Sequence, residues 1–280
     1  MNLDLAQTMT LTAHGNAFLR GSKYAMAPEL THTNSTFQLV SNLTFVREDS
    51  RLPAGKRDVE VSRNTASWFE DLRTRGAQRL WLIIFEVQHT HVPPYIASAF
   101  SNFSGWAIQV DFDGGFEFWV PHWTAGRRDD PGRRIWDVVY RGVPFTAQAD
   151  SAPVELPPAT ADLRAALEAA ERFARRAYVD FWADWFINAL AQLDAVEPNA
   201  PFHGNIFPKS GYSLRARQTL AAAVQSFVFG GMGSWNDLSF NDADLQRDYV
   251  QVTRDLDRAV MAALVAATNA FDVGVGALSV

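Results

Sequence analysis

The chain has 280 residues, a formal net charge of −6 and no cysteine. This length accommodates one large domain or two ordinary ones. The lack of cysteine excludes disulfides, cysteine-ligated zinc, iron–sulfur clusters and thiol nucleophiles, and the acidic balance argues against nucleic acid as a general partner. The N-terminus lacks the apolar segment of a secretory signal, and the longest apolar run, residues 80–85, is too short to span a membrane. We therefore expect a cytoplasmic protein without a membrane segment.

The first half of the chain has the composition and alternation of β-strands. Residues 36–49 and 79–88 have strand-like composition, and residues 133–142 resemble the last strand of a meander. The clearest pattern is "GWAIQVDFDGGFEFWVPHW", residues 105–123, where alternation on both sides of Asp113-Gly114-Gly115 predicts a β-hairpin. Between the early strands, residues 62–76 predict one short helix, with Ser62 or Asn64 as its cap and Gly76 at its end.

The second half changes to helical periodicity after a proline-rich segment, residues 151–160. Apolar residues at three- and four-residue steps from Leu163 to Leu193 predict one helix of about nine turns, capped by Thr160. A second helix is expected from about Ser213 through Phe229, and a third from about Asp242 to Phe271. Short connections between such helices favour an antiparallel bundle.

The segment "VFGGMGSWNDLSF", residues 228–240, interrupts the helical pattern. Gly230 or Gly231 suits the position just after a helix end, where glycine tolerates the left-handed conformation. Met232 and Trp235 can fold back onto the helices, and Ser234, Asn236 and Asp237 can bond to nearby backbone and hold the turn. Two alternatives remain: the N–H groups around Gly230, Gly231 and Gly233 bind an anion, or the loop contacts a partner with Trp235 as its anchor and Asn236 and Asp237 beside it.

The same segment carries a family resemblance. "FGGMGSWNDLSF" resembles the "YGGMGSFNDL" signature of a family of small helical bacterial proteins of unknown function. Three other segments are similar as well: "FWADWFINALAQL", "LAAAVQSFVFGG" and "DLDRAVMAALVAATN", so the resemblance covers roughly residues 165–270. The chain differs by having Trp235 instead of Phe, an insertion around residues 201–213 and a β-rich first half. Genes of this family often lie among toxin and immunity genes, so the resemblance implies an immunity-type role.

Three histidines are weak candidates for a metal site. His89 and His91 alternate after a strand, which places both rings on one face, and His122 lies in the returning arm of the hairpin. Three imidazoles suit zinc and leave an open coordination position. The alternative is that these histidines are ordinary edge or loop residues.

Acidic and basic side chains give three further candidate groups. Asp111 and Asp113 suit either turn formation or acid–base and cation-binding chemistry, and Glu117, on the returning strand, is expected to point the same way as Asp111. Residues 126–134 form a mixed-charge loop that either is simply solvated or contacts phosphate or acidic surfaces. On the long predicted helix, Phe181 and Trp185 fit the core face and Asp180 and Asp184 lie beside them, as solvated acids or as an edge for a basic partner.

Together these patterns predict an α+β fold. The first half is an N-terminal antiparallel β-sheet with one helix (residues 1–150), a linker follows (151–160), and the C-terminal domain is an α-helical bundle (161–280). We expect a non-enzymatic bacterial interaction protein of the immunity type, which binds and neutralises a toxin domain, with no cofactor and with a protein partner, a basic toxin domain being one class. The alternative is a metal-dependent enzyme or small-molecule binder that uses the β-domain face or the cleft between domains.

Overall fold

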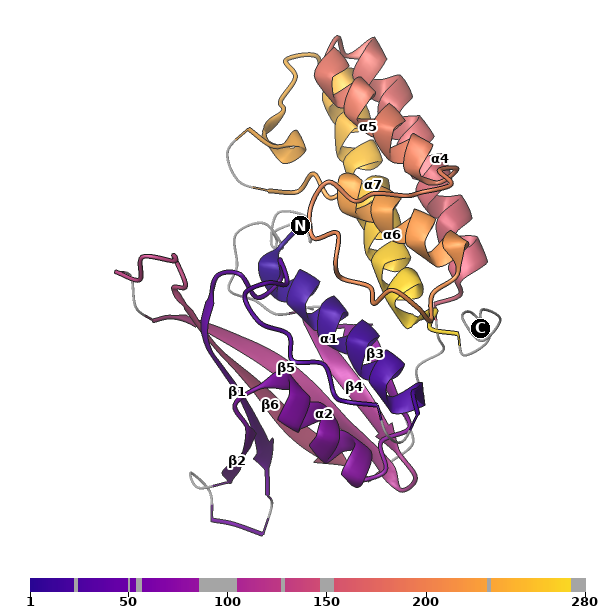
Figure 1. Cartoon of the computed structure of the whole chain (residues 1–280). Coiled ribbons are helices and arrows are strands. Elements are labelled where there is room, and N and C mark those ends of the chain that lie inside the picture. Colours follow the sequence, from indigo (N-terminus) through magenta and orange to yellow (C-terminus); the bar gives the residue numbers. More distant parts are fainter. Residues whose placement is uncertain are drawn as a thin grey trace.

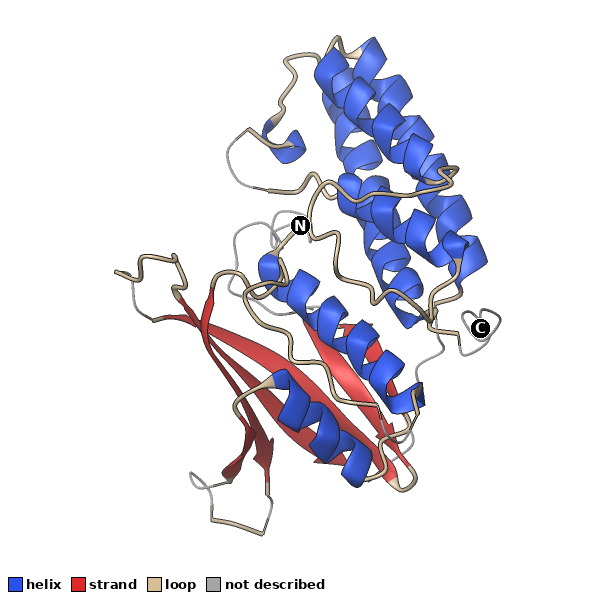
Figure 2. Ribbon diagram, in the orientation of Figure 1, coloured by secondary structure: helices blue, strands red, loops and turns tan. Residues whose placement is uncertain are grey.

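The computed structural model describes residues 1–22, 25–49, 51–53, 57–85, 105–126, 129–146, 154–230 and 233–272. Within these ranges the chain combines one six-stranded sheet with helices, which confirms the α+β class (Figure 1). Two helices lie against one face of the sheet, and a second group of helices lies beyond them (Figure 2).

The sheet is mixed rather than wholly antiparallel. Its order is β2-β1-β6-β5-β4-β3, and the last four strands in this order form the predicted antiparallel meander. β1 runs parallel to β6, with Val46 opposite Arg141, so the expectation of an antiparallel sheet is wrong at this pair. The strands are β1 (Val40–Glu48), β2 (Asp58–Ser62), β3 (Arg79–Ile84), β4 (Trp106–Phe112), β5 (Gly115–Ala125) and β6 (Trp136–Phe145).

The hairpin and the first predicted helix both form where the sequence pattern predicted them. β4 and β5 join through Asp113 and Gly114, with Phe112 paired to Gly115. Helix α2 (Thr65–Thr74) is capped by Asn64, whose side-chain oxygen accepts the Ser67 N–H at 2.8 Å. The chain then leaves the helix through Gly76, at a φ of 81° that glycine tolerates.

Helix α1 (Leu3–Arg20) is absent from the sequence expectation, which gave the first half one helix. It lies between the sheet and the long helices (Figure 1) and is buried over most of its length. A helix enclosed from several sides needs no one-sided apolar stripe, so its periodicity is weak. The hydroxyls of its buried threonines donate hydrogen bonds to the backbone carbonyl one turn earlier. Thr10 donates to Ala6 at 2.8 Å, and Thr12 donates to Thr8 at 2.9 Å.

Two asparagines bond to the outer edge of β3, which is the last strand of the sheet among the described residues. Asn16 of α1 donates to the Leu80 carbonyl at 2.7 Å and accepts the Leu80 N–H at 2.9 Å. Asn269 makes the same two bonds with Leu82, at 3.0 Å and 2.8 Å. Each side-chain amide thus takes the place of a neighbouring strand, which satisfies an edge that would otherwise pair with another chain.

The C-terminal helices are α4 (Leu156–Arg176), α5 (Asp180–Gln192), α6 (Leu214–Gln225) and α7 (Ala243–Asn269), with a short turn of 3-10 helix, η1 (Trp235–Asp237). Each of these helices packs against its neighbours, and α6 and α7 begin where predicted, with Ser213 and Asp242 as their caps. α4 begins at Leu156, inside the predicted linker, because prolines are tolerated in a first helical turn. Thr160 therefore does not cap the helix; its hydroxyl donates to the Leu156 carbonyl at 2.7 Å.

Two predicted helix lengths are wrong. The nine-turn helix is interrupted at residues 177–179, so α4 and α5 are separate helices. The second helix ends at Gln225 instead of Phe229, and Gly230 is not in the left-handed region. The intervening residues 226–229 are buried without helical structure, which sequence periodicity does not distinguish from a helix end.

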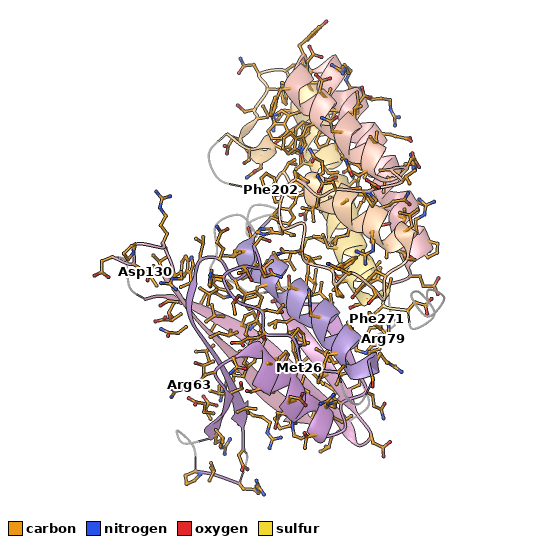
Figure 3. All side chains as sticks on the ribbon, viewed as in Figure 1. Met26, Arg63, Arg79, Asp130, Phe202 and Phe271 are labelled. Atoms are coloured by element: carbon orange, nitrogen blue, oxygen red, sulfur yellow. The ribbon has the colours of Figure 1, made fainter. Side chains whose placement is uncertain are left out.

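The sheet and the C-terminal helices share a hydrophobic core. Leu5 and Met9 of α1, Leu82 of β3 and Trp106 of β4 belong to the same buried cluster as Phe186 of α5 and the apolar faces of α6 and α7. Figure 3 shows Arg79 and Phe271 at this junction, where the Arg79 guanidinium donates to the Asn269 carbonyl at 2.7 Å. None of the described helices has the length and apolar character needed to cross a membrane.

Candidate interaction surface

The glycine-rich loop binds its own side chains. The Gly230 N–H donates to the Asn236 side-chain oxygen at 3.2 Å, and the N–H groups of Gly233 and Ser234 donate to one carboxylate oxygen of Asp237. The Asp237 carboxylate therefore lies where an external anion would bind. Ser234, Asn236 and Asp237 hold the turn as predicted; Gly231 lies outside the described residues.

Trp235, which the sequence offered as a partner anchor, is 0% exposed. Its indole N–H donates to the Thr253 hydroxyl at 2.8 Å, and its carbonyl accepts the Tyr249 hydroxyl at 2.7 Å. Its ring centroid lies 5.1 Å from that of Phe186 and 5.8 Å from that of Trp182. A ring without exposed surface cannot contact a partner of the folded protein, so Trp235 is a core residue that ties the loop to the bundle.

Of the three candidate metal-binding histidines, only His122 lies within the described residues. His89 and His91 lie outside the described residues, and His122 is exposed on β5. Within the described ranges, no three histidine, aspartate or glutamate side chains are close enough together to hold a metal ion.

The hairpin carboxylates point in different directions. Asp111 pairs with Phe116 and Glu117 with Val110, so Asp111 and Glu117 lie on opposite faces of the sheet. Glu117 is buried and accepts two bonds from Arg75, at 2.6 Å and 3.0 Å. Asp111 accepts the indole N–H of Trp81 at 2.6 Å and an amide N–H of Gln109 at 2.7 Å. The two carboxylates therefore form no common site, and the expectation that they point the same way is wrong.

The mixed-charge loop after β5 extends away from the helices, as the position of Asp130 in Figure 3 shows. Asp130 accepts the Gly132 N–H at 2.7 Å and forms an ion pair with Arg134 at 3.2 Å. Arg133 is exposed and has a φ of 56°. The described part of this loop is thus a turn held by its own aspartate.

The strongest surface feature is the corner where α4 turns into α5. We call residues Arg175, Tyr178, Asp180, Phe181 and Asp184 the α4–α5 corner. It lies at the end of the bundle remote from the sheet, near the start of α7 (Figure 1), where Arg176 pairs with Asp248 at 2.6 Å. The sequence analysis identified Asp180 and Asp184 in this region but not Tyr178.

Tyr178 adopts an unfavourable backbone conformation without burying its side chain. Its φ is 57°, in the left-handed region, and 90% of the residue is exposed. The Val179 N–H bonds to the Ala174 carbonyl at 3.0 Å, the pattern of a helix end that normally places glycine where Tyr178 stands. A left-handed non-glycine residue costs roughly 1–2 kcal/mol. The described contacts of the ring offer no compensation, because the ring is almost wholly in solvent.

Phe181 extends the exposed aromatic surface. The sequence predicted that it faces the core, but 66% of it is exposed, while Ala183 and Phe186 are buried. The break at residues 177–179 interrupts the helical phase, so Phe181 falls outside the buried face of α5, whereas Ala189 and Leu193 of the predicted face remain buried. The Phe181 ring lies over Trp182 and Trp185, with centroid distances of 5.2 Å and 6.0 Å.

Arg175 connects the two helices through carboxylates. Its guanidinium contacts Asp180 at 2.8 Å, Asp184 at 2.5 Å and Glu171 at 3.4 Å. The hydrogen bonds to Asp180 and Asp184 raise the pKa of Arg175, so it stays charged at every ordinary pH. The segment "RRAYVD" contains the signal of this break: basic residues suit the end of one helix and an aspartate suits the start of the next.

One carboxyl outside the corner should contribute to how stability depends on pH. Burial raises the pKa of Asp257, on α7, to about 7. The folded state therefore tolerates the protonated form best, and its stability declines as pH rises from about 4 through about 7. We expect Asp257→Asn to increase the free energy of unfolding by about 1–3 kcal/mol at pH 8 and to have no effect near pH 4.

Urea unfolding of both proteins at pH 8, 6 and 4 measures this effect. Asp255→Asn, on the same helix, is the matched control, because Asp255 already pairs with the exposed Arg258 at 3.1 Å. A gain that is equal at pH 4 and pH 8 would contradict the assignment to the carboxylate charge.

Comparisons with known proteins do not assign the chain to a family. No family model matches it, and searches of curated proteins and of solved structures found no match either. The α4–α5 corner is therefore the feature of the molecule from which a function can be inferred.

Proposed function

We propose that this chain is a non-enzymatic interaction protein that binds a protein partner through the α4–α5 corner. The observation that supports the proposal most directly is Tyr178: an aromatic residue in a left-handed conformation with 90% of its surface exposed. A residue that costs folding energy and contributes little packing is a reason to look for function. Exposed aromatic side chains dominate the binding energy of many protein interfaces.

We further propose that the partner is a toxin domain and that the chain neutralises it, as an immunity-type protein does. This part rests on the resemblance of residues 228–240 to the bacterial family described above and on the exposed acids of the corner. The arrangement as two domains, 1–150 and 161–280 with a linker between, is likewise a proposal. The immunity role predicts that the partner is encoded near this gene.

Replacing Tyr178 with glycine should change stability and binding in opposite directions. Relief of the left-handed conformation, less the added chain entropy of glycine, should raise the free energy of unfolding by up to about 1 kcal/mol. Loss of the ring should weaken partner binding by about tenfold or more. A residue with only a structural role cannot give this combination.

The test uses tagged unmodified protein, Tyr178→Gly and Phe181→Ser in parallel pull-downs from the native host lysate, with mass spectrometry. Met26→Ser is the matched control, because Met26 is an apolar residue 91% exposed on a different part of the molecule. We expect a stoichiometric protein retained by the unmodified chain and the control, and lost from both corner variants. Equal recovery by all four proteins would refute the corner as the binding surface.

A further inference from the structure

The α4–α5 corner carries more negative than positive charge. Arg175 is the guanidinium shared by Glu171, Asp180 and Asp184, so one positive charge faces three negative charges. The neighbouring Arg172 and Arg176 are engaged elsewhere, with Glu168 at 3.9 Å and Asp248 at 2.6 Å. The side chains of Asp180 and Asp184 are 67% and 66% exposed, so each retains acceptor capacity toward solvent.

An exposed aromatic ring lies beside these carboxylates. Phe181 and Asp184 are three residues apart on α5, which places them next to each other on the helix surface. A cation bound to Asp184 therefore lies within reach of the exposed Phe181 ring. A planar guanidinium suits both groups better than an ammonium, because it binds carboxylates in a bidentate manner and stacks on rings.

Charge also discriminates between possible occupants. A second copy of this chain would place the same excess of negative charge against itself, which opposes association through this surface. A partner with a basic surface is attracted instead. Its guanidinium would approach Asp180 and Asp184 at the positions that Arg175 occupies in the free protein.

From this arrangement we infer that the partner places an arginine against Asp180 and Asp184. An apolar side chain of the partner lies next to this arginine and covers Tyr178 and Phe181. In the free protein Arg175 occupies the position that the partner's arginine takes on binding. The inference rests on the proposed function, because it specifies what the same surface recognises. It makes Arg175 a competitor of the partner and Asp184 a contact of the partner, so the two residues should affect binding in opposite directions.

The experiment uses a displayed library of random twelve-residue peptides. The library is selected on the full chain and counter-selected on Tyr178→Gly, so that the surviving peptides depend on the corner. We expect these peptides to be enriched in arginine beside an apolar residue. For one such synthetic peptide, we expect Asp184→Asn to weaken binding by about tenfold and Arg175→Gln to strengthen it by about threefold. Thermal unfolding of each variant confirms that the exposed substitutions leave the fold intact.

Different results overturn the inference and the proposed function. Corner-dependent peptides without a basic residue, or weaker binding to Arg175→Gln, overturn the arginine inference and leave protein binding at the corner standing. Peptides that bind equally well to Tyr178→Gly contradict the proposed surface. A library that yields no corner-dependent peptide counts against both.

Discussion

Trp235→Ala should lower the free energy of unfolding by about 3–5 kcal/mol, as expected for removal of a fully enclosed aromatic side chain. The ring is 0% exposed and is surrounded by aromatic residues of α4, α5 and α7. The substitution leaves a cavity between these helices and removes the hydrogen bond to the Thr253 hydroxyl. Urea unfolding followed by circular dichroism measures the change.

Trp235→Phe is the matched control. It keeps most of the ring and removes the indole N–H, so the expected loss is about 1–2 kcal/mol. A loss below about 1 kcal/mol for Trp235→Ala would show that the ring is not part of the core. Because Trp235 supports the fold, a binding defect in its variants would not identify a contact; Tyr178 and Phe181 are the residues with which to test binding.

Asn269→Ala should lower the free energy of unfolding by about 2–4 kcal/mol. The change leaves the N–H and the carbonyl of Leu82 without partners at a buried strand edge, and each such group costs about 1–3 kcal/mol. Asn269 is also the last residue of α7, so its loss loosens the attachment of α7 to the sheet. Urea unfolding measures the loss, and hydrogen exchange of the Leu82 amide reports the same edge directly.

Gln251→Ala provides a control on the same helix. Gln251 is exposed and donates to the Asp255 carboxylate at 2.8 Å. Its removal should change stability by less than about 0.5 kcal/mol. Two results would contradict this prediction: a loss of unfolding free energy for Asn269→Ala as small as that of the control, or unchanged hydrogen-exchange protection of the Leu82 amide. Either would show that the two hydrogen bonds between Asn269 and Leu82 do not stabilise the junction.

Interactions within a few residues were predictable from the sequence. The Asp113-Gly114 turn fixes the hairpin, because these residues tolerate its backbone conformation and the alternating flanks pair across it. Asn64, Ser213 and Asp242 cap their helices because a short polar side chain reaches the free N–H groups of the next turn. Ser234, Asn236 and Asp237 form the loop bonds for the same reason.

Errors arose where distant segments decide the outcome. α1 has polar threonines and asparagines in a buried helix, and the burial of Asn16 is favourable because its side chain pairs with the Leu80 backbone of β3. The parallel pairing of β1 with β6 joins strands about a hundred residues apart, as Val46 opposite Arg141 illustrates, and no local pattern encodes its direction. The sequence left open whether Trp235 packs against the helices or anchors a partner, because its enclosure is provided by helices on either side of it in the sequence.

By itself, the sequence determined the α+β class, the hairpin turn and the cap of α2, because each depends on backbone preferences and hydrogen bonds within a few residues. Only the tertiary structure decided which aromatic residues are enclosed and which are exposed. The three-residue break before α5 rotates that helix so that Phe186 enters the core and Phe181 faces solvent. The candidate interaction surface depends on that packing, because residue type alone does not decide which of several aromatic residues is enclosed.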